Sequence, residues 1–154
     1  MRPLLILLAS LLMTSPAQSQ AAAVPAPDAA APATPQRLLV HLTHGPEAPT
    51  RAALAFSVAK AALDDGHTVV LFLAGDAVQL LRDAVLNSLN GVGTGNLREF
   101  YNAIVAKGGR FYVSLGSSRA RGVTEADLQG KPAEFAGPPQ LVKLTMAFDR
   151  TLTY

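Results

Sequence analysis

The stretch RLLVHLTHGPEAPTRAALAFSVAKAALDDGHTVVLFLA, residues 37–74, decides the fold because it reads as a strand, a helix and a second strand. Residues 37–43 and 68–74 are continuous apolar runs, as expected of parallel strands that are covered on both faces. Between them, Thr50 is placed to cap a helix, and Gly66 is placed to end it. The stretch therefore predicts two parallel strands joined by a helix.

Three later helices are predicted from the residues at their starts. In each, a helix-capping residue is followed three positions later by a side chain able to cap in return: Asp76 with Gln79, Asn96 with Glu99, and Thr124 with Asp127. The first of these helices is expected to run unbroken through residues 77–90. The segment GVGTGN, residues 91–96, follows a helix rather than a strand. It therefore predicts a helix-to-helix connection and not a phosphate-binding glycine loop.

Strand signals continue to the end of the chain. RFYVS (110–114) reads as a third strand, EFA (134–136) as a minor strand and TLTY (151–154) as the last. An amphipathic helix over residues 139–150 separates the final two strands. Because strands alternate with helices, the sequence predicts an α/β fold with a mostly parallel open sheet of about five strands and helices on both faces. We expect the first three strands in the doubly wound order 2-1-3.

The N-terminus has the parts of a secretory signal peptide, residues 1–21. Arg2 supplies a positive charge, Leu4–Met13 form a short apolar run, and a small, polar tail follows. The apolar run is well below the ~20 residues that span a bilayer. We expect cleavage between Ala17 and Ala21, with an uncleaved anchor as the alternative. No stable membrane insertion is expected after cleavage.

Two segments follow the predicted signal peptide. Residues 22–36 are almost wholly alanine and proline, a composition that predicts a flexible, PPII-like linker. Residues 37–154 form one domain of ordinary size, large enough for a single hydrophobic core. The sequence therefore predicts an exported, periplasmic protein with one folded domain.

Charge and cysteine content exclude several function classes. With Arg2 removed, the 13 basic residues become 12 against 11 acidic residues, which leaves a net charge of +1. The basic residues are scattered, so we expect no binding to nucleic acid. The chain has no cysteine. This excludes disulfides, thiolate catalysis and cysteine-ligated metals.

The three histidines do not form a metal-binding pattern. His41 and His44 are three residues apart at the end of a strand, a spacing that turns their side chains to opposite faces. His67 lies in a separate turn. We therefore expect neither a metal site nor a cofactor. His41, inside the first strand, is expected to be a hydrogen-bonded core histidine.

The candidate ligand site lies at the carboxyl ends of the first three strands, where open parallel sheets usually bind ligands. The third strand is expected to run into a small-residue turn, LGSS (115–118), before two closely spaced arginines. Backbone N–H groups, hydroxyls and positive charge there suit a small anion. The predicted ligand-binding residues are Thr43, His44, Gly75, Ser114, Gly116, Ser117, Arg119 and Arg121. The alternative is that the two arginines make surface or subunit ion pairs.

The same strand ends also allow a hydrolytic interpretation. In the strand order 2-1-3, Asp76, His44 and Ser114 would line up as the carboxylate, base and nucleophile of a catalytic triad. Against this reading, the chain has no G-x-S-x-G elbow. Each of the three residues also has a simpler structural role, as a helix cap, a turn residue or a strand end. A cryptic hydrolase is therefore kept as the alternative function.

Several separate stretches, in the right order, resemble the DsrE/DsrF-like family with its YchN-like fold. They are LTHGPEAPTRAALAFSVAKAALDDGHTVVLFLAGDAV (42–78), the Arg121-Gly122 pair and the ending FDRTLTY (148–154). The resemblance covers residues 37–154. It implies a compact, largely parallel α/β domain that assembles into trimers, hexamers or mixed oligomers. Several members are persulfide carriers in sulfur oxidation or thiouridine synthesis.

The resemblance assigns a particular position to Ser114. In the sulfur-carrying members, a cysteine at the end of the third strand lies seven residues before the arginine of an Arg-Gly pair. Counting back from Arg121 reaches Ser114. A hydroxyl cannot hold a persulfide, because that chemistry needs a polarisable thiolate of low pKa. We therefore expect a non-catalytic module that binds a small ligand or a protein and is associated with sulfur or redox metabolism.

The expected partners are other copies of this chain and, in addition, a small anion or a periplasmic protein. The resemblance implies a homo-oligomer, either a trimer or a hexamer. The segment LREFYNAIVA (97–106) adds apolar and aromatic residues at helical spacing. Phe100, Tyr101 and Ile104 are therefore expected to lie in the core or at a subunit interface.

Overall fold

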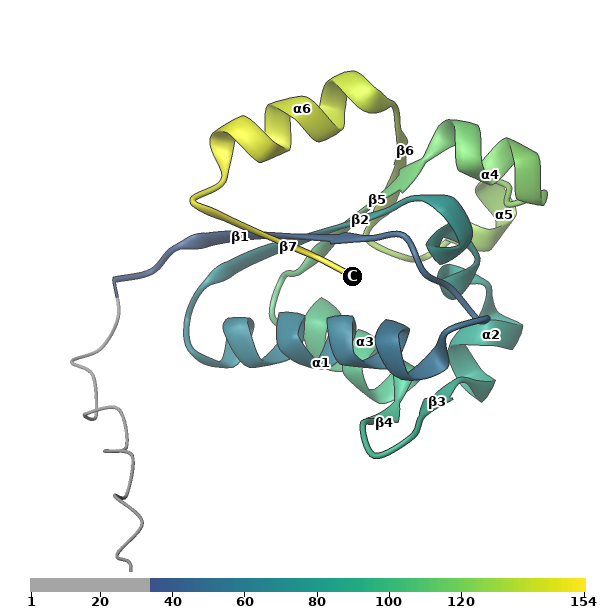
Figure 1. The fold of residues 1–154 in the computed structure, drawn as a ribbon, viewed down its shortest axis with the longest axis horizontal. Coiled ribbons are helices and arrows are strands. Elements are labelled where there is room, and N and C mark those ends of the chain that lie inside the picture. Colours follow the sequence, from purple (N-terminus) through teal and green to yellow (C-terminus); the bar gives the residue numbers. More distant parts are fainter. Residues whose placement is uncertain (1–33) are drawn as a thin grey trace, which may run out of the picture. The chain divides into compact units, whose positions relative to one another are not determined.

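The computed structural model describes residues 34–154, so the predicted signal peptide and most of the predicted linker lie outside the described residues. Five parallel strands form one sheet in the order β6-β5-β2-β1-β7 (Figure 1). The predicted parallel sheet with helices on both faces is confirmed. The strands are β1 (Arg37–Leu42), β2 (Thr68–Leu73), β5 (Arg110–Ser114), β6 (Ala133–Ala136) and β7 (Arg150–Thr153).

The order of the first three strands differs from the prediction. β2 lies between β1 and β5, whereas the order 2-1-3 would place β1 in the middle. The reason is burial: Val69 to Leu73 are five consecutive buried residues, as required of a strand covered on both faces and paired on both sides. β1 instead pairs with the C-terminal strand β7 on its other side.

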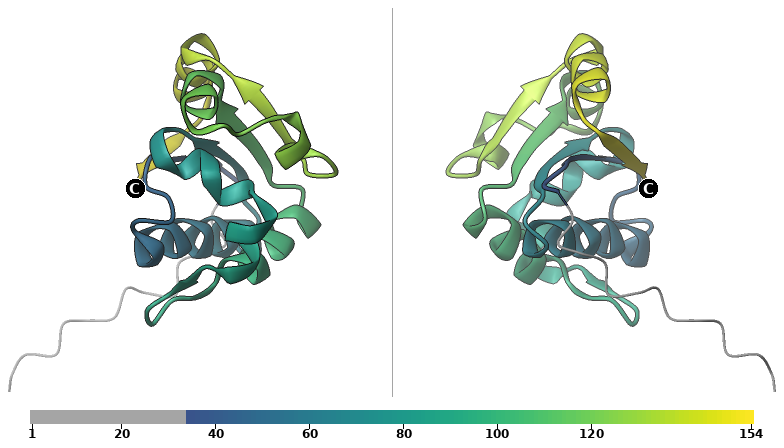
Figure 2. Two further views of the ribbon diagram at one scale, coloured as in Figure 1. Left: turned by 90° about the vertical axis from the view of Figure 1, so that its right-hand side faces the viewer. Right: turned by 90° about the vertical axis from the view of Figure 1, so that its left-hand side faces the viewer.

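Helices cover the two faces of the sheet unequally (Figure 2). α1 (Pro49–Asp64) and α3 (Leu97–Ala106) pack on one face and enclose the larger core, in which Phe111 contacts the rings of Phe56 and Tyr101. α6 (Pro138–Ala147) covers the other face over a smaller cluster. That cluster is Leu39, Val70, Phe72, Ala136 and Leu144.

Of the four predicted helix starts, those at Asn96 and Thr124 are confirmed and those at Thr50 and Asp76 are wrong. Asn96 accepts a hydrogen bond from the Glu99 N–H at the start of α3. Thr124 and Asp127 form a capping box at the start of α5 (Glu125–Leu128). Thr50, however, lies inside α1, which begins at Pro49, and its hydroxyl accepts from a backbone N–H in the hairpin after α2.

The helix predicted over residues 77–90 is broken into two. A 3₁₀ helix, η1 (Gly75–Leu81), is followed by α2 (Asp83–Ser88), and Arg82 between them has an extended backbone. Asp76 lies within η1 rather than at its cap. Its carboxylate contacts Arg121, which belongs to another helix. The predicted connection between helices at residues 91–96 is confirmed. It contains a short antiparallel hairpin formed by β3 (Asn90–Gly91) and β4 (Gly95–Asn96).

The prediction of a small-residue turn after the third strand is wrong, because α4 (Leu115–Arg121) begins directly after β5. Ser114 is both the last residue of β5 and the N-cap of α4. Gly122 ends the helix in the left-handed conformation, with a φ of 64°. No helix within residues 34–154 has the length and apolar character needed to cross a membrane.

We predict that Ser118→Ala stabilises the protein. Ser118 is 1% exposed, and its hydroxyl has no hydrogen-bond partner among the described residues. Removing an unpaired buried hydroxyl and adding a better helix former should raise the free energy of unfolding by about 1 kcal/mol in urea denaturation.

Ser117→Ala is the matched control, one position earlier on α4. Its hydroxyl accepts from the Gly75 N–H at 3.0 Å, so its loss should lower the free energy of unfolding by about 1 kcal/mol. Equal destabilisation by both variants would contradict the assignment of Ser118 as unpaired.

Candidate functional site

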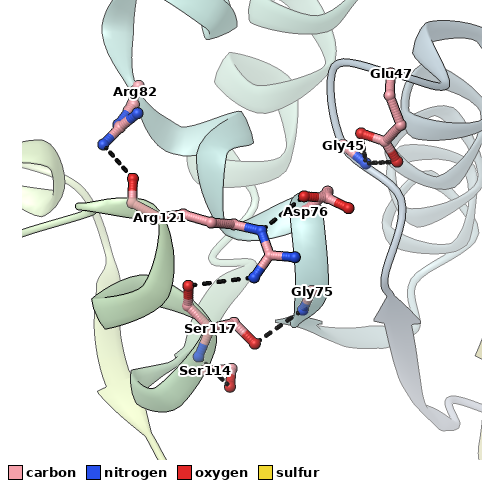
Figure 3. A network of polar contacts seen from close by, with 8 residues as sticks. All are labelled: Gly45, Glu47, Gly75, Asp76, Arg82, Ser114, Ser117 and Arg121. Carbon is pink, nitrogen blue, oxygen red and sulfur yellow. Dashed lines mark hydrogen bonds and ion pairs between the residues drawn. The ribbon is translucent and has the colours of Figure 1, made fainter.

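An ion pair joins η1 and α4, the helices that follow β2 and β5 at the carboxyl edge of the sheet (Figure 3). The Arg121 Nε donates to Asp76 Oδ1 at 2.6 Å, and the two side chains are 29% and 45% exposed. The hydrogen bond from Arg121 holds the pKa of the Asp76 carboxyl below its usual value of 3.8. The pair neutralises both charges where the sequence predicted a positively charged anion site.

Two serines connect α4 to the neighbouring strand end. The Ser114 hydroxyl accepts from the Ser117 N–H at 3.4 Å, and the Ser117 hydroxyl accepts from the Gly75 N–H at 3.0 Å (Figure 3). Arg121 adds a long contact of 3.5 Å to the Ser117 carbonyl. Ser114 and Arg121 are thus linked to Ser117, and Ser117 makes the hydrogen bond to Gly75.

Arg82 reaches this site from the break between η1 and α2. Its guanidinium donates to the carbonyls of Arg121 and Gly122, at 2.9 Å and 2.5 Å, and lies 3.7 Å from the Asp127 carboxylate. Arg82 therefore binds the carbonyl end of α4 and fixes the backbone that carries Arg121. Sequence reasoning missed it, because no local pattern links residues about forty positions apart.

The loop after β1 packs against the start of η1 through backbone atoms. The Thr43 carbonyl accepts from the N–H groups of Asp76 and Ala77, at 3.1 Å and 3.3 Å. A Cβ on Gly45 would collide with the backbone carbonyl of Asp76. Gly45 N–H in turn donates to the Glu47 carboxylate (Figure 3). Only glycine fits this position, and the close approach holds Asp76 facing Arg121.

The predicted triad does not assemble. His44 lies at 2.8 Å from Arg51 through Nε2 and at 3.3 Å from the Thr43 hydroxyl through Nδ1. Asp76 contacts Arg121, and Ser114 caps α4, so no hydrogen bond within residues 34–154 joins Ser114, His44 and Asp76. Because β2 lies between β1 and β5, the carboxylate separates the base from the hydroxyl.

The predicted ligand-binding residues therefore divide into two groups. Gly75, Ser114, Ser117 and Arg121 meet between β2 and β5, whereas Thr43 and His44 contact residues at the β1–β7 side. Gly116 and Arg119 are exposed on α4. Ligand binding by these residues stays a prediction.

His41 occupies the opposite face of β1 from the larger core. Its ring meets Phe72 edge-on, with centroids 5.9 Å apart, and burial lowers the pKa of its imidazole from the usual 6.5. No cluster of three His, Asp or Glu side chains in the described part of the chain is arranged to hold a metal ion.

The geometry restricts the chemistry available between β2 and β5. Within residues 34–154, the Ser114 hydroxyl accepts from the Ser117 N–H and makes no hydrogen bond to an imidazole or a carboxylate, the groups that would activate it as a nucleophile. The Arg121 charge is already compensated by Asp76. An anion binding there would have to compete with that carboxylate.

Comparisons with known proteins identify the family and the fold. The model of the DsrE/DsrF-like family matches residues 36–154. The structure is similar to the YchN protein of E. coli, with a TM-score of 0.61 and 17% identity over 77% of this chain and 99% of that one. No curated protein sequence matches the chain.

Two further solved structures share the fold. A protein of unknown function from Methanobacterium thermoautotrophicum has a TM-score of 0.58 and 18% identity, over 77% of this chain and 99% of its own. A conserved protein of unknown function from Bacteroides thetaiotaomicron has a TM-score of 0.56 and 14% identity, over 77% and 95%. At these identities the likeness concerns the fold alone.

We predict that Asp76→Asn destabilises the protein at neutral pH and not in acid. A depressed carboxyl pKa contributes stability above the unfolded value of 3.8, and this is lost as the pH falls through the lower, folded value. The difference in urea midpoint between wild type and variant should therefore shrink between about pH 7 and about pH 3.

The control is Asp65→Asn, at the end of α1, where the carboxylate makes no ion pair within residues 34–154. This variant removes no ion pair, so its difference from wild type should not shrink in acid in the way expected for Asp76→Asn. A constant Asp76→Asn difference would mean that the ion pair does not form in solution.

Proposed function

Because the chain belongs to the DsrE/DsrF-like family, we propose that it is an exported, non-catalytic relative of the family's sulfur carriers that acts as an oligomeric binding module. In this proposal the protein is periplasmic and is associated with sulfur or redox metabolism. Its partners are further copies of the chain and a small anion or a periplasmic protein.

The observation that carries the proposal is Ser114. It stands at the end of β5, where the carriers that the chain resembles have their cysteine, and the whole chain contains no cysteine. Its hydroxyl accepts a hydrogen bond from the first turn of α4, so the residue serves the fold. Persulfide transfer by the family's route is therefore not open to this chain.

The surrounding contacts favour binding over reaction. Arg121 is paired with Asp76, and Arg82 holds the end of α4, so the charged groups stabilise the local structure. These contacts keep the backbone of the carrier site in place after the thiol is gone. A rigid surface of this kind is suited to a protein or small-ligand contact, and nothing in its geometry favours the hydrolase alternative.

Assembly is the most direct test of the proposed function. Tyr101 and Ile104 of α3 are buried in the core, so they do not contribute to a subunit interface. α6 instead exposes Val142 and Met146, one turn apart and 56% and 82% exposed. Light scattering on the purified protein should give the mass of a trimer or a hexamer. A monomer over a wide concentration range would contradict the oligomeric module.

We predict that Ser114→Cys creates a reactive thiol. The new thiol would sit at the N-cap of α4, where the Ser117 N–H favours a thiolate, so its pKa should fall below the ~8.5 of a free cysteine. It should alkylate faster than an ordinary thiol near neutral pH and gain the mass of a persulfide from a sulfane donor.

The matched control is Ser88→Cys, an exposed position at the end of α2 whose hydroxyl contacts a helix carbonyl. Its thiol should alkylate at the rate expected of an exposed cysteine. If Ser114→Cys reacts more slowly than this control at every pH below about nine, the carrier-site reading fails and a purely architectural role is left.

A further inference from the structure

A groove runs between the edge strand β6 and α6, on the face of the sheet that α6 covers. Its volume is about 650 Å³, and all of its walls come from residues 112–143. The first turns of α6 form one wall, β6 forms the other, and Tyr112 of the neighbouring strand β5 contributes to the floor. We call this hollow the α6 groove.

Tyr112 is held in place by its neighbours. Its ring stacks on Phe72 of β2, with centroids 6.5 Å apart and planes at 17°. Burial raises the pKa of the Tyr112 phenol above its usual value of 10.0, and the Glu134 carboxylate beside it raises that pKa further. The hydroxyl is therefore protonated at neutral pH and can both donate and accept a hydrogen bond.

The two walls of the α6 groove carry opposite charges. Glu134 lies opposite Tyr112 in the strand register and two residues before the buried Ala136, so its side chain is on the face that α6 covers. Lys143 lies one turn after Gln140 on α6, and both line the groove. Neither Glu134 nor Lys143 makes an ion pair in the part of the chain that the structure describes. The groove therefore presents an anion and a cation from opposite sides.

The backbone at the start of α6 offers no free donor in its first three residues. Pro138 and Pro139 have no backbone N–H. The N–H of Gln140, which follows them, donates to the Gly137 carbonyl at 3.0 Å. Recognition of an anion in the groove would therefore rest on side chains, namely the Lys143 ammonium and the Gln140 amide.

We infer that the α6 groove binds a free α-amino acid with an apolar side chain. The α-carboxylate would contact Lys143 and Gln140 on one wall. The α-ammonium would contact Glu134 and the Tyr112 hydroxyl on the other, and the apolar side chain would lie against Pro139. An ion of one sign leaves the opposite wall unpaired, whereas a zwitterion balances both charges at once. Because the two charged side chains are exposed, we expect weak binding, with a Kd on the order of 1 mM.

The α6 groove shares no residue with the contacts among Ser114, Ser117 and Arg121, so the inference goes beyond the proposed function. The groove also excludes Val142 and Met146, the exposed apolar residues of α6. Failure of the Ser114→Cys test would therefore leave the groove unaffected, and failure of amino-acid binding would leave the proposed module unaffected.

Titration of the purified, isotope-labelled protein with phenylalanine, followed by NMR at about pH 6, tests the inference under conditions in which the α-amino group carries its charge. N-acetylphenylalanine lacks the ammonium, and phenylalaninamide lacks the carboxylate. Phenylalanine should shift the amide signals of β6 and of the first turns of α6, and it should bind about fivefold more tightly than either analogue. Equal binding of either analogue overturns the inference, and so does the absence of phenylalanine binding at about 20 mM.

Two variants then assign each charge to its wall. Both replace exposed side chains, so thermal unfolding should stay close to that of wild type. Glu134→Gln should abolish the preference for phenylalanine over N-acetylphenylalanine and keep the preference over phenylalaninamide, and Lys143→Gln should do the reverse. The matched control is Glu125→Gln, an exposed acid on α5 outside the groove, which should leave all three affinities unchanged. If either groove variant keeps both preferences, the inference is overturned. A changed oligomer mass in either one overturns it too, because the groove would then be a subunit contact.

Discussion

The close backbone approach between the loop after β1 and the start of η1 is the constraint on which the rest of the site depends. The Thr43 carbonyl accepts from two successive N–H groups of η1, and Gly45 lies too close to Asp76 for any side chain. These contacts fix the first turn of η1 relative to the end of β1. Because the hydrogen bonds are between backbone atoms, they depend on side chains only through the glycine.

That contact also determines which way the polar side chains turn. Asp76 faces α4 and forms its ion pair with Arg121, while His44 faces α1 and contacts Arg51. Two regions with different electrostatics result on one edge of the sheet. Between β2 and β5 the charges are paired and the hydroxyls are engaged. On the β1–β7 side, Arg51 contacts His44 and makes no ion pair with an Asp or Glu side chain of residues 34–154.

The backbone around Ser114 is held by contacts that do not depend on a thiol. The N-cap role of Ser114 and the contacts of Arg82 with α4 stabilise the backbone whether or not residue 114 is reactive. The architecture at this site therefore rests on Ser114 and Arg82 and needs no cysteine, a residue that the chain does not contain. The exposure of β7 has a different cause. This four-residue edge strand lies at the side of α1, so it is not buried on both faces.

The sequence by itself determined the strands, most of the helices, the parallel sheet and the absence of cysteine, because apolar periodicity, capping residues and composition are local properties. Only the tertiary structure decided that β2 is central, that residues 77–90 break at Arg82, and that Asp76 pairs with Arg121 instead of capping a helix. These features depend on contacts between residues about forty positions apart. Which residues meet in such contacts depends on the order of the strands in the sheet. The alternation of strands and helices along the sequence does not determine that order.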